Sequence, residues 1–168
     1  MNKAVFFDRD GVINSDEGHY YIFCCEDFHL NTNIVGNLKM LTDAGFLLII
    51  ISNQGGIAKG IYTKDDTDKI HELMRAKFAE AKIEITEIYY CPHHEETGKC
   101  LCRKPNSLMI EKAMARFNID PLKSFFIGDS NRDMEAAEKA GIKSFLVPKN
   151  TDIKALCEII INQSNSKI

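Results

Sequence analysis

Short apolar runs alternate with longer amphipathic segments along the whole chain of 168 residues. The apolar runs have the length and composition of buried strands, and they cover Ala4–Phe7, Phe46–Ile51, Ile85–Tyr90, Ser124–Ile127 and Ser144–Val147. The segments between them predict helices over Asn33–Ala44, Thr63–Ala81, Asn106–Phe117, Ser130–Ala140 and Asp152–Ile161. This alternation predicts an α/β fold of three layers, in which helices cover both faces of a parallel central sheet.

Local signals support several of these boundaries. Thr63 is a favourable N-cap for the helix that follows it, and Gly45 and Gly141 are placed to end the helices before them. The length suits a single domain that spans residues 1–168. We expect only the tail, residues 162–168, to be loose, as chain ends often are.

Composition and charge exclude several classes of protein. The apolar content of 45% and the charged content of 27% are ordinary for a globular chain, and the net charge of -3 argues against a nucleic-acid partner. The longest apolar run, Phe46–Ile51, is too short to span a membrane, and Asp8 ends the N-terminal apolar stretch before it could serve as a signal peptide. We therefore expect a cytoplasmic protein whose six cysteines bind metal or pack rather than form disulfides.

Three unusually polar segments follow the predicted strands: Asp8–Glu26, Ser52–Tyr62 and Cys91–Pro105. Ligands of parallel sheets bind beyond the carboxyl ends of the strands. We therefore expect the functional residues to lie on these loops.

The first of these loops begins with two carboxylates, Asp8 and Asp10, two residues apart. Gly11 permits the turn that would bring them to one site, where they could hold a hard divalent cation. A carboxylate beside such a cation can attack phosphorus, and its partner can act as general acid and base. An acidic turn is the plain alternative; a calcium loop is excluded because Gly11 comes too early in the motif.

Other candidate groups follow the later strands. Ser52, Asn53 and Gln54 can present hydroxyl and amide donors to a phosphate. Arg103 and Lys104 supply two cations just before a predicted helix, where an exposed basic pair is the alternative interpretation.

Cysteine and histidine residues gather in the third loop. Three thiols and one imidazole are a complete tetrahedral set for structural zinc, and the sequence offers Cys91, His93, Cys100 and Cys102, with His94 as a rival to His93. Such a set has no open position and would be structural rather than catalytic. For Cys24, Cys25 and Cys157 we expect packing roles.

The segment Phe6–Asn14 resembles the first motif of phosphatases of the haloacid dehalogenase (HAD) superfamily, and three later segments are similar to its second, third and fourth motifs in order. The resemblance implies a Rossmann-like domain and a magnesium-dependent phosphatase that forms an aspartyl-phosphate. The residues that would carry the reaction are Asp8 as nucleophile, Asp10 as general acid and base, and Ser52 and Lys104 as ligands of the phosphoryl group. Magnesium would be bound by Asp8, the backbone carbonyl of Asp10 and Asp129, with Asp133 in a supporting role.

The zinc loop, residues 91–102, narrows the resemblance to the group that contains heptose-1,7-bisphosphate 7-phosphatases and the histidinol-phosphatase domain. This resemblance favours His93 over His94 as the zinc ligand and implies a monomer that acts on a small phosphorylated metabolite. The loop from Gly11 to Asn33 and the segment from Gly55 to Tyr62 are too short to hold a large cap domain. The substrate-binding residues expected on this basis are Asp16, Glu17, Gly18, His19, Asn53, Gln54 and Arg103. We favour the heptose bisphosphate as substrate, because the chain lacks the dehydratase to which histidinol-phosphatase is often fused. Histidinol phosphate and a non-catalytic zinc module are the alternatives.

Overall fold

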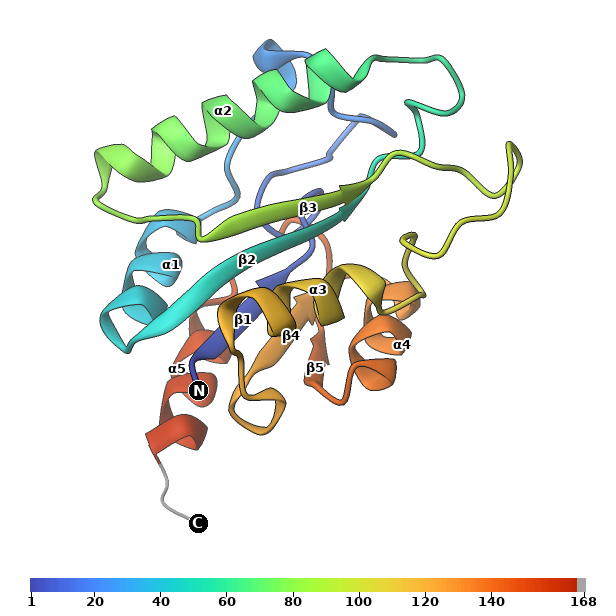
Figure 1. Cartoon of the computed structure of the whole chain (residues 1–168). Helices are drawn as coiled ribbons and strands as arrows, with labels where there is room; N and C mark the ends of the chain where they lie inside the picture. Colours follow the sequence, from blue (N-terminus) through green and yellow to red (C-terminus); the bar gives the residue numbers. More distant parts are fainter. Residues whose placement is uncertain (166–168) are drawn as a thin grey trace.

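The computed structural model describes residues 1–165 and contains a five-stranded parallel sheet with the strand order β3-β2-β1-β4-β5 (Figure 1). The strands are β1 (Lys3–Phe7), β2 (Phe46–Asn53), β3 (Glu87–Cys91), β4 (Phe125–Gly128) and β5 (Lys143–Leu146). The helices are α1 (Ile34–Asp43), α2 (Lys64–Glu80), α3 (Leu108–Phe117), α4 (Asn131–Lys139) and α5 (Lys154–Asn165), and two 3-10 turns are η1 (Cys25–Asp27) and η2 (Pro121–Lys123). The predicted three-layer, Rossmann-like α/β fold is confirmed.

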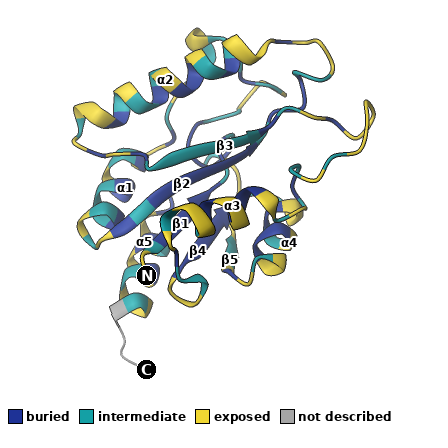
Figure 2. Ribbon diagram, viewed as in Figure 1, coloured by how far each residue is buried: buried dark blue, intermediate teal, exposed yellow. Residues whose placement is uncertain are grey.

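The side chains of β1 alternate between two apolar cores, as a strand buried on both faces requires. Val5 and Phe7 pack into the core that includes residues of α1, α2 and α5. Ala4 and Phe6 pack into the core that includes residues of α3 and α4. All four side chains are fully buried, and Figure 2 shows the central strands as the darkest part of the molecule.

Most element boundaries lie one or two residues from the predicted ones, and the differences at β3, α3 and the end of α5 are among the larger. β3 begins at Glu87 rather than Ile85, and α3 begins at Leu108 rather than Asn106, because the Asn106 N–H turns back to the Arg103 carbonyl at 2.9 Å. Helix α5 continues as far as Asn165, beyond its predicted end at Ile161 and into the tail that we expected to be loose; the last part of that tail, residues 166–168, lies outside the described residues. The Thr63 N-cap is confirmed, and it forms a capping box with Asp66.

The carboxyl ends of the strands meet at one edge of the sheet. Phe7 pairs with Ile50 on one side and Ile127 on the other, and the Asp8 N–H donates to the Ile127 carbonyl at 3.0 Å. Between β1 and α1 the only regular element is η1, so the absence of a large cap domain holds for residues 1–165. No helix within that range has the length and apolar character needed to cross a membrane.

Candidate active site

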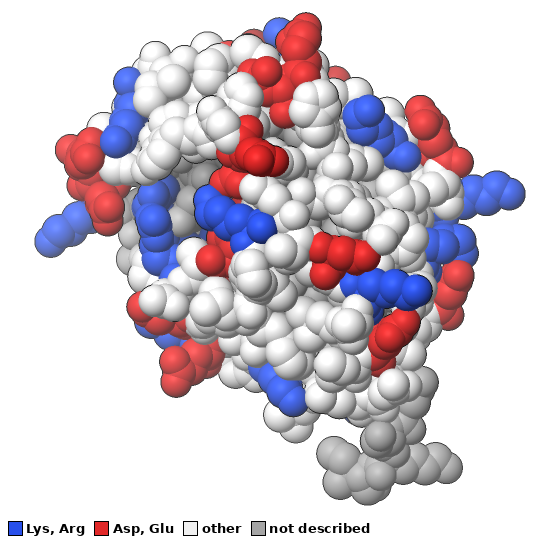
Figure 3. Space-filling view, turned by 180° about the vertical axis from the view of Figure 1, so that it is seen from behind, with Lys and Arg blue, Asp and Glu red and all other residues white. Residues whose placement is uncertain are grey.

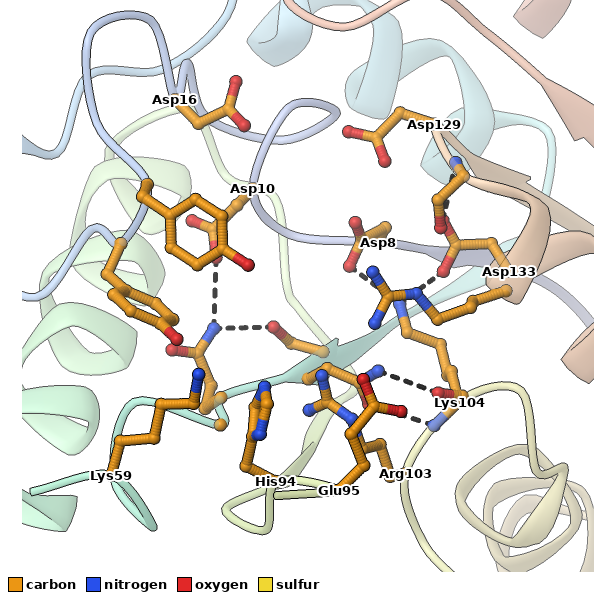
Figure 4. Close-up of a pocket in the computed structure, with 18 of the residues that line it drawn as sticks. Asp8, Asp10, Asp16, Lys59, His94, Glu95, Arg103, Lys104, Asp129 and Asp133 are labelled. Carbon is orange, nitrogen blue, oxygen red and sulfur yellow. Dashed lines mark hydrogen bonds and ion pairs between the residues drawn. The ribbon is translucent and has the colours of Figure 1, made fainter. Parts of the chain in front are cut away.

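A pocket of about 390 Å³ opens at this edge of the sheet, lined by the loops that follow β1, β2, β3 and β4. Asp8, Asp129 and Asp133 lie on one side of it, with Lys104 between them and the zinc loop, and Lys59, His94 and Arg103 lie on the other side (Figure 4). Figure 3 shows the molecule from behind, with a hollow bordered by both basic and acidic side chains. The site therefore combines charges of both signs, as binding of a cation and an anion together requires.

Lys104 connects the partly exposed carboxylate of Asp8 with the buried carboxylate of Asp133. Its Nζ lies 2.8 Å from Asp8 Oδ1 and 2.6 Å from Asp133 Oδ1, and it also donates to the Ile51 carbonyl. Burial alone would lower the pKa of Lys104, but the charges of Asp8 and Asp133 raise it above its usual value. The ammonium therefore remains charged within the pocket wall, where it can neutralise a phosphate.

Asp129 has the properties of a cation ligand. One oxygen each of Asp8, Asp129 and Asp133 lie within 4.8 Å of one another. Asp129 Oδ2 is buried and has no hydrogen-bond partner among residues 1–165. Burial and the neighbouring Asp133 raise the pKa of Asp129 to about 6. Burial likewise raises the pKa of Asp8 to about 7, with Lys104 opposing and Asp133 and Asp129 adding to the shift. Three carboxylates share one nearby ammonium, Lys104, so negative charge remains, and such oxygen donors fit a hard cation such as magnesium.

Gly11 allows the loop after β1 to pass close to this acidic group. Its φ is +88°, and a Cβ atom at this position would lie 2.0 Å from Asp129 Oδ2. Both the positive φ and the close approach require glycine. The turn proposed from the sequence therefore has a second function, which is to leave room for the carboxylate.

The Asp10 carboxylate is held by four donors. Oδ1 accepts from Arg9 Nε and Asn14 Nδ2, each at 3.0 Å. Oδ2 accepts from Arg9 Nη2 at 2.9 Å and from Gln54 Nε2 at 3.1 Å. The Asp10 side chain remains 27% exposed and lines the pocket, so it is fixed in position and still accessible.

The two amides predicted to bind substrate are occupied by protein partners. Asn53 clamps the backbone of Lys104, because its Nδ2 donates to the Lys104 carbonyl and its Oδ1 accepts from the Lys104 N–H, both at 3.0 Å. Gln54 donates to Ser52 Oγ at 2.7 Å as well as to Asp10, and it accepts from the Tyr62 hydroxyl at 2.7 Å. Asn53 thus holds the backbone of Lys104, and Gln54 holds the side chains of Asp10 and Ser52, whereas the Ser52 hydroxyl hydrogen remains available.

Only part of the loop that we predicted to contact substrate lines the pocket. Asp16 and His19 line the pocket, and the Asp16 carboxylate is paired with Lys149 and accepts from Asn150 Nδ2 at 3.1 Å. Glu17 and Gly18 are exposed and do not line this pocket. A pairing of Asp16 with the loop after β5 could not be predicted from sequence distance.

The four residues of the predicted zinc site converge. One ligand atom each of Cys91, His93, Cys100 and Cys102 lie within 4.8 Å of one another. Their sulfur–sulfur separations are 2.9 and 3.6 Å, and His93 Nδ1 lies 3.3 and 3.5 Å from two of the sulfurs. This donor set fits tetrahedral zinc.

His94 points away from the metal cluster. Its Nδ1 accepts the Glu96 N–H at 3.2 Å, and the side chain lines the pocket instead. Among the other cysteines, Cys157 is buried as expected, but Cys25 is exposed, so the packing role predicted for it is wrong.

The sequence did not predict the contribution of several residues that line the pocket. Asp133 was given only a supporting role, although its carboxylate contacts Lys104 and also caps α4 through Ser130. Lys59 and Lys149 line the pocket as additional cations. The four-residue spacing from Asp129 was a usable signal for Asp133, but nothing local marks the two lysines.

Comparisons with known proteins agree with this geometry. A sequence model of the family described as HAD-hydrolase-like matches residues 101–159. The D-glycero-beta-D-manno-heptose-1,7-bisphosphate 7-phosphatase of Haemophilus ducreyi is 40% identical, over 84% of this chain and 80% of its own. The D-glycero-alpha-D-manno-heptose-1,7-bisphosphate 7-phosphatase of Campylobacter jejuni is 41% identical, over 86% of this chain and 81% of its own.

A solved structure is similar along nearly its whole length. The crystal structure of the D,D-heptose 1,7-bisphosphate phosphatase from B. bronchiseptica, complexed with magnesium and phosphate, has a TM-score of 0.85 and 27% sequence identity. The match covers 96% of this chain and 99% of that one. A HAD-like phosphatase from Mesorhizobium loti, at 23% identity and a TM-score of 0.86, shares the fold.

The parallel sheet, with Asp8, Lys104 and Asp129 at its carboxyl edge, defines a phosphatase of the HAD class. The relatives narrow this further: the chain belongs to the family of D-glycero-D-manno-heptose-1,7-bisphosphate 7-phosphatases. It is accordingly an enzyme, and the alternative of a non-catalytic zinc module is set aside.

Proposed function

We propose that this chain removes the 7-phosphate of D-glycero-D-manno-heptose 1,7-bisphosphate, a step toward nucleotide-activated heptose for lipopolysaccharide. The observation that carries the proposal is the position of Lys104 Nζ, 2.8 Å from Asp8 Oδ1, beside the unpartnered Asp129. The names of the relatives supply the substrate. The reaction would take place in the cytoplasm, where thiols stay reduced and can bind zinc, in a single domain that acts as a monomer.

In the first step, a carboxylate oxygen of Asp8 attacks phosphorus and the bond between phosphorus and the C7 oxygen breaks. Asp10 gives a proton to the departing alkoxide, and the phosphoryl group remains on Asp8 as an acyl phosphate. Lys104 and the Ser52 hydroxyl bind the phosphoryl oxygens. Their fixed donors stabilise the charge that these oxygens gain in the transition state.

In the second step, Asp10 takes a proton from water, which attacks the phosphorus of the acyl phosphate. The bond between phosphorus and Asp8 breaks, inorganic phosphate leaves and the Asp8 carboxylate is restored. Asp10 thus ends each cycle with the proton that it gives to the next leaving group. The products are the heptose 1-phosphate and inorganic phosphate.

Two metals belong to this proposal. Asp8, Asp129 and the Asp10 carbonyl would hold magnesium, and Asp133 would support them through Lys104. When bound, magnesium supplies positive charge against the phosphoryl oxygens and keeps Asp8 ionised. Zinc on Cys91 and its three partners would order the loop that precedes Lys104.

The far side of the pocket suits a second anion. Arg103 lines it and donates from Nη1 to the His93 carbonyl at 3.1 Å, which leaves its other donors free for ligand. Lys59 lies nearby, paired with Glu96 at 2.9 Å. We assign Arg103 to the 1-phosphate, and His19 and Asp16 to the sugar side of the pocket.

A substrate panel tests the proposal directly. The heptose 1,7-bisphosphate should have a higher kcat/KM than histidinol phosphate or simple sugar monophosphates, and hydrolysis should stop when magnesium is chelated. Faster turnover of histidinol phosphate would contradict the heptose assignment. Asp8→Asn should abolish turnover in a folded protein, while Asp43→Asn, at an exposed ion pair with Lys39, should not.

A further inference from the structure

Arg9, which lies between the two catalytic aspartates in sequence, is completely buried, with a relative exposure of 0%. Arginine is among the residues least often buried, and it needs partners for its donors when it is. Nε and Nη2 bind the two oxygens of Asp10 at 3.0 and 2.9 Å. Nη2 also donates to the Ile22 carbonyl at 2.8 Å. The guanidinium therefore forms a bidentate pair on the protein side of a carboxylate that faces the pocket.

The remaining nitrogen of the guanidinium, Nη1, contacts a histidine on α2. Arg9 Nη1 lies 3.3 Å from His71 Nε2. Because arginine cannot accept a hydrogen bond, the histidine nitrogen must be the acceptor. His71 is itself only 7% exposed and packs edge-on against Tyr90, with ring centroids 5.2 Å apart. The orientation of Arg9 is thus fixed by a helix that contributes nothing else to the reaction.

We propose that Arg9 is the positioning residue for Asp10, with His71 holding Arg9 in turn; this inference rests on the proposed function, in which Asp10 is the acid and base. A carboxylate gripped at both oxygens cannot rotate about its terminal bond. Arg9 is fully buried, whereas Asp10 is 27% exposed and lines the pocket, so Arg9 holds Asp10 from the side away from substrate. When the general acid is misplaced, the reaction becomes slower even though the substrate still binds.

Arg9→Lys tests the grip, because lysine keeps the charge but cannot make the bidentate contact. We expect kcat on an alkyl phosphate to fall by about tenfold or more with KM close to wild type. Phosphoenzyme formation from p-nitrophenyl phosphate, measured by rapid quench, should change little, because that leaving group departs without a proton. Arg75→Lys is the matched control: Arg75 also binds a carbonyl and an acid, Ile85 and Glu87, away from the pocket. It should leave both rates unchanged.

A second pair of variants tests whether His71 on α2 holds Arg9 in position. These variants also test the proposal if Arg9→Lys does not fold. His71→Gln keeps an acceptor for Arg9, whereas His71→Leu removes it. We expect His71→Leu to reproduce the selective loss with alkyl phosphates and His71→Gln to retain most of the rate. Equal losses on both substrates, or no loss, would overturn the positioning role.

The inference can fail separately from the proposed function. If the wild-type enzyme hydrolysed no phosphomonoester, the proposed function would be wrong. A crystal structure of Arg9→Lys would still decide the positioning role. A rotated Asp10 carboxylate supports it, and an unmoved one contradicts it.

Discussion

Arg103 Nη1 donates to the backbone carbonyl of His93 at 3.1 Å. One hydrogen bond thus connects a residue of the predicted zinc site with the side chain that we assign to the second phosphate. Gly55 lies beneath this contact, since a Cβ there would come within 3.0 Å of Arg103 Nη1 and 2.8 Å of His94. We therefore expect that disorder in the zinc loop would weaken the binding of substrate.

Cys100→Ala should release zinc and lower both stability and affinity. Loss of one of four ligands weakens metal binding, so metal analysis should find less than one zinc per chain and the Tm should fall. Because the loop also carries Arg103, KM for a bisphosphate should rise more than KM for a monophosphate. The matched control, Cys25→Ala, changes an exposed thiol outside the cluster and should keep full zinc content.

Gly11→Ala should impair cation binding. The added methyl group would lie 2.0 Å from Asp129 Oδ2, on a backbone with φ of +88°. We expect magnesium affinity, measured by calorimetry, to fall by about tenfold or more, since displacing one ligand by a fraction of an ångström weakens a site of fixed geometry. Gly141→Ala has a similar φ of +72° but nothing within 4 Å. It should cost stability from backbone strain and leave magnesium affinity intact.

Magnesium binding should depend on pH. Burial and neighbouring acids raise the pKa of Asp8 to about 7, with Lys104 opposing, and that of Asp129 to about 6. Both groups must be ionised to bind a cation, so affinity should increase as the pH rises from about 5 to about 8. Calorimetry in buffers of different ionisation enthalpy should detect proton release at the lower pH and little at the higher. An affinity independent of pH would show that these carboxylates do not bind the ion.

We expect the free energy of unfolding to fall in mild acid because of His71. Burial, and then the charge of Arg9, lowers the pKa of His71 to about 3. In the unfolded chain a histidine has a pKa of about 6.5. The stability that comes from keeping His71 neutral is therefore fully present above pH ~6.5 and is lost as the pH falls toward the folded-state pKa. At pH 5 the loss is about 2 kcal/mol. Chemical denaturation should find that His71→Gln loses less stability between pH 7 and pH 5 than the wild type.

The sheet and the position of several pocket residues could be predicted from the sequence, for a physical reason. Apolar runs such as Phe46–Ile51 mark buried strands, and polar residues that directly follow them must lie at one edge of a parallel sheet. Ser52 and Asp129 line the pocket at this edge, as the rule predicts, whereas the roles expected of them come from the resemblance to HAD phosphatases. The start of α3 was misplaced because the sequence does not show that the Asn106 N–H turns back to Arg103.

Side-chain orientation was the part that the sequence could not supply. Asn53 and Gln54 line the pocket, but their amides bind Lys104 and Asp10, which the sequence does not reveal. Arg9 stands within the first motif, yet its burial and its contact with His71 depend on α2, which lies far along the chain. Contacts of this kind appear only once the helices are packed.

The central strand β1 pairs with β4 across most of the chain. On the ribosome, Asp8 leaves the exit tunnel long before Lys104 and Asp129 have been synthesised, so no early fragment can carry out catalysis. A nascent chain would acquire phosphatase activity only after β4 joins the sheet, late in translation. Enzymatic turnover in stalled chains of increasing length would therefore report when the pairing of β1 with β4 forms.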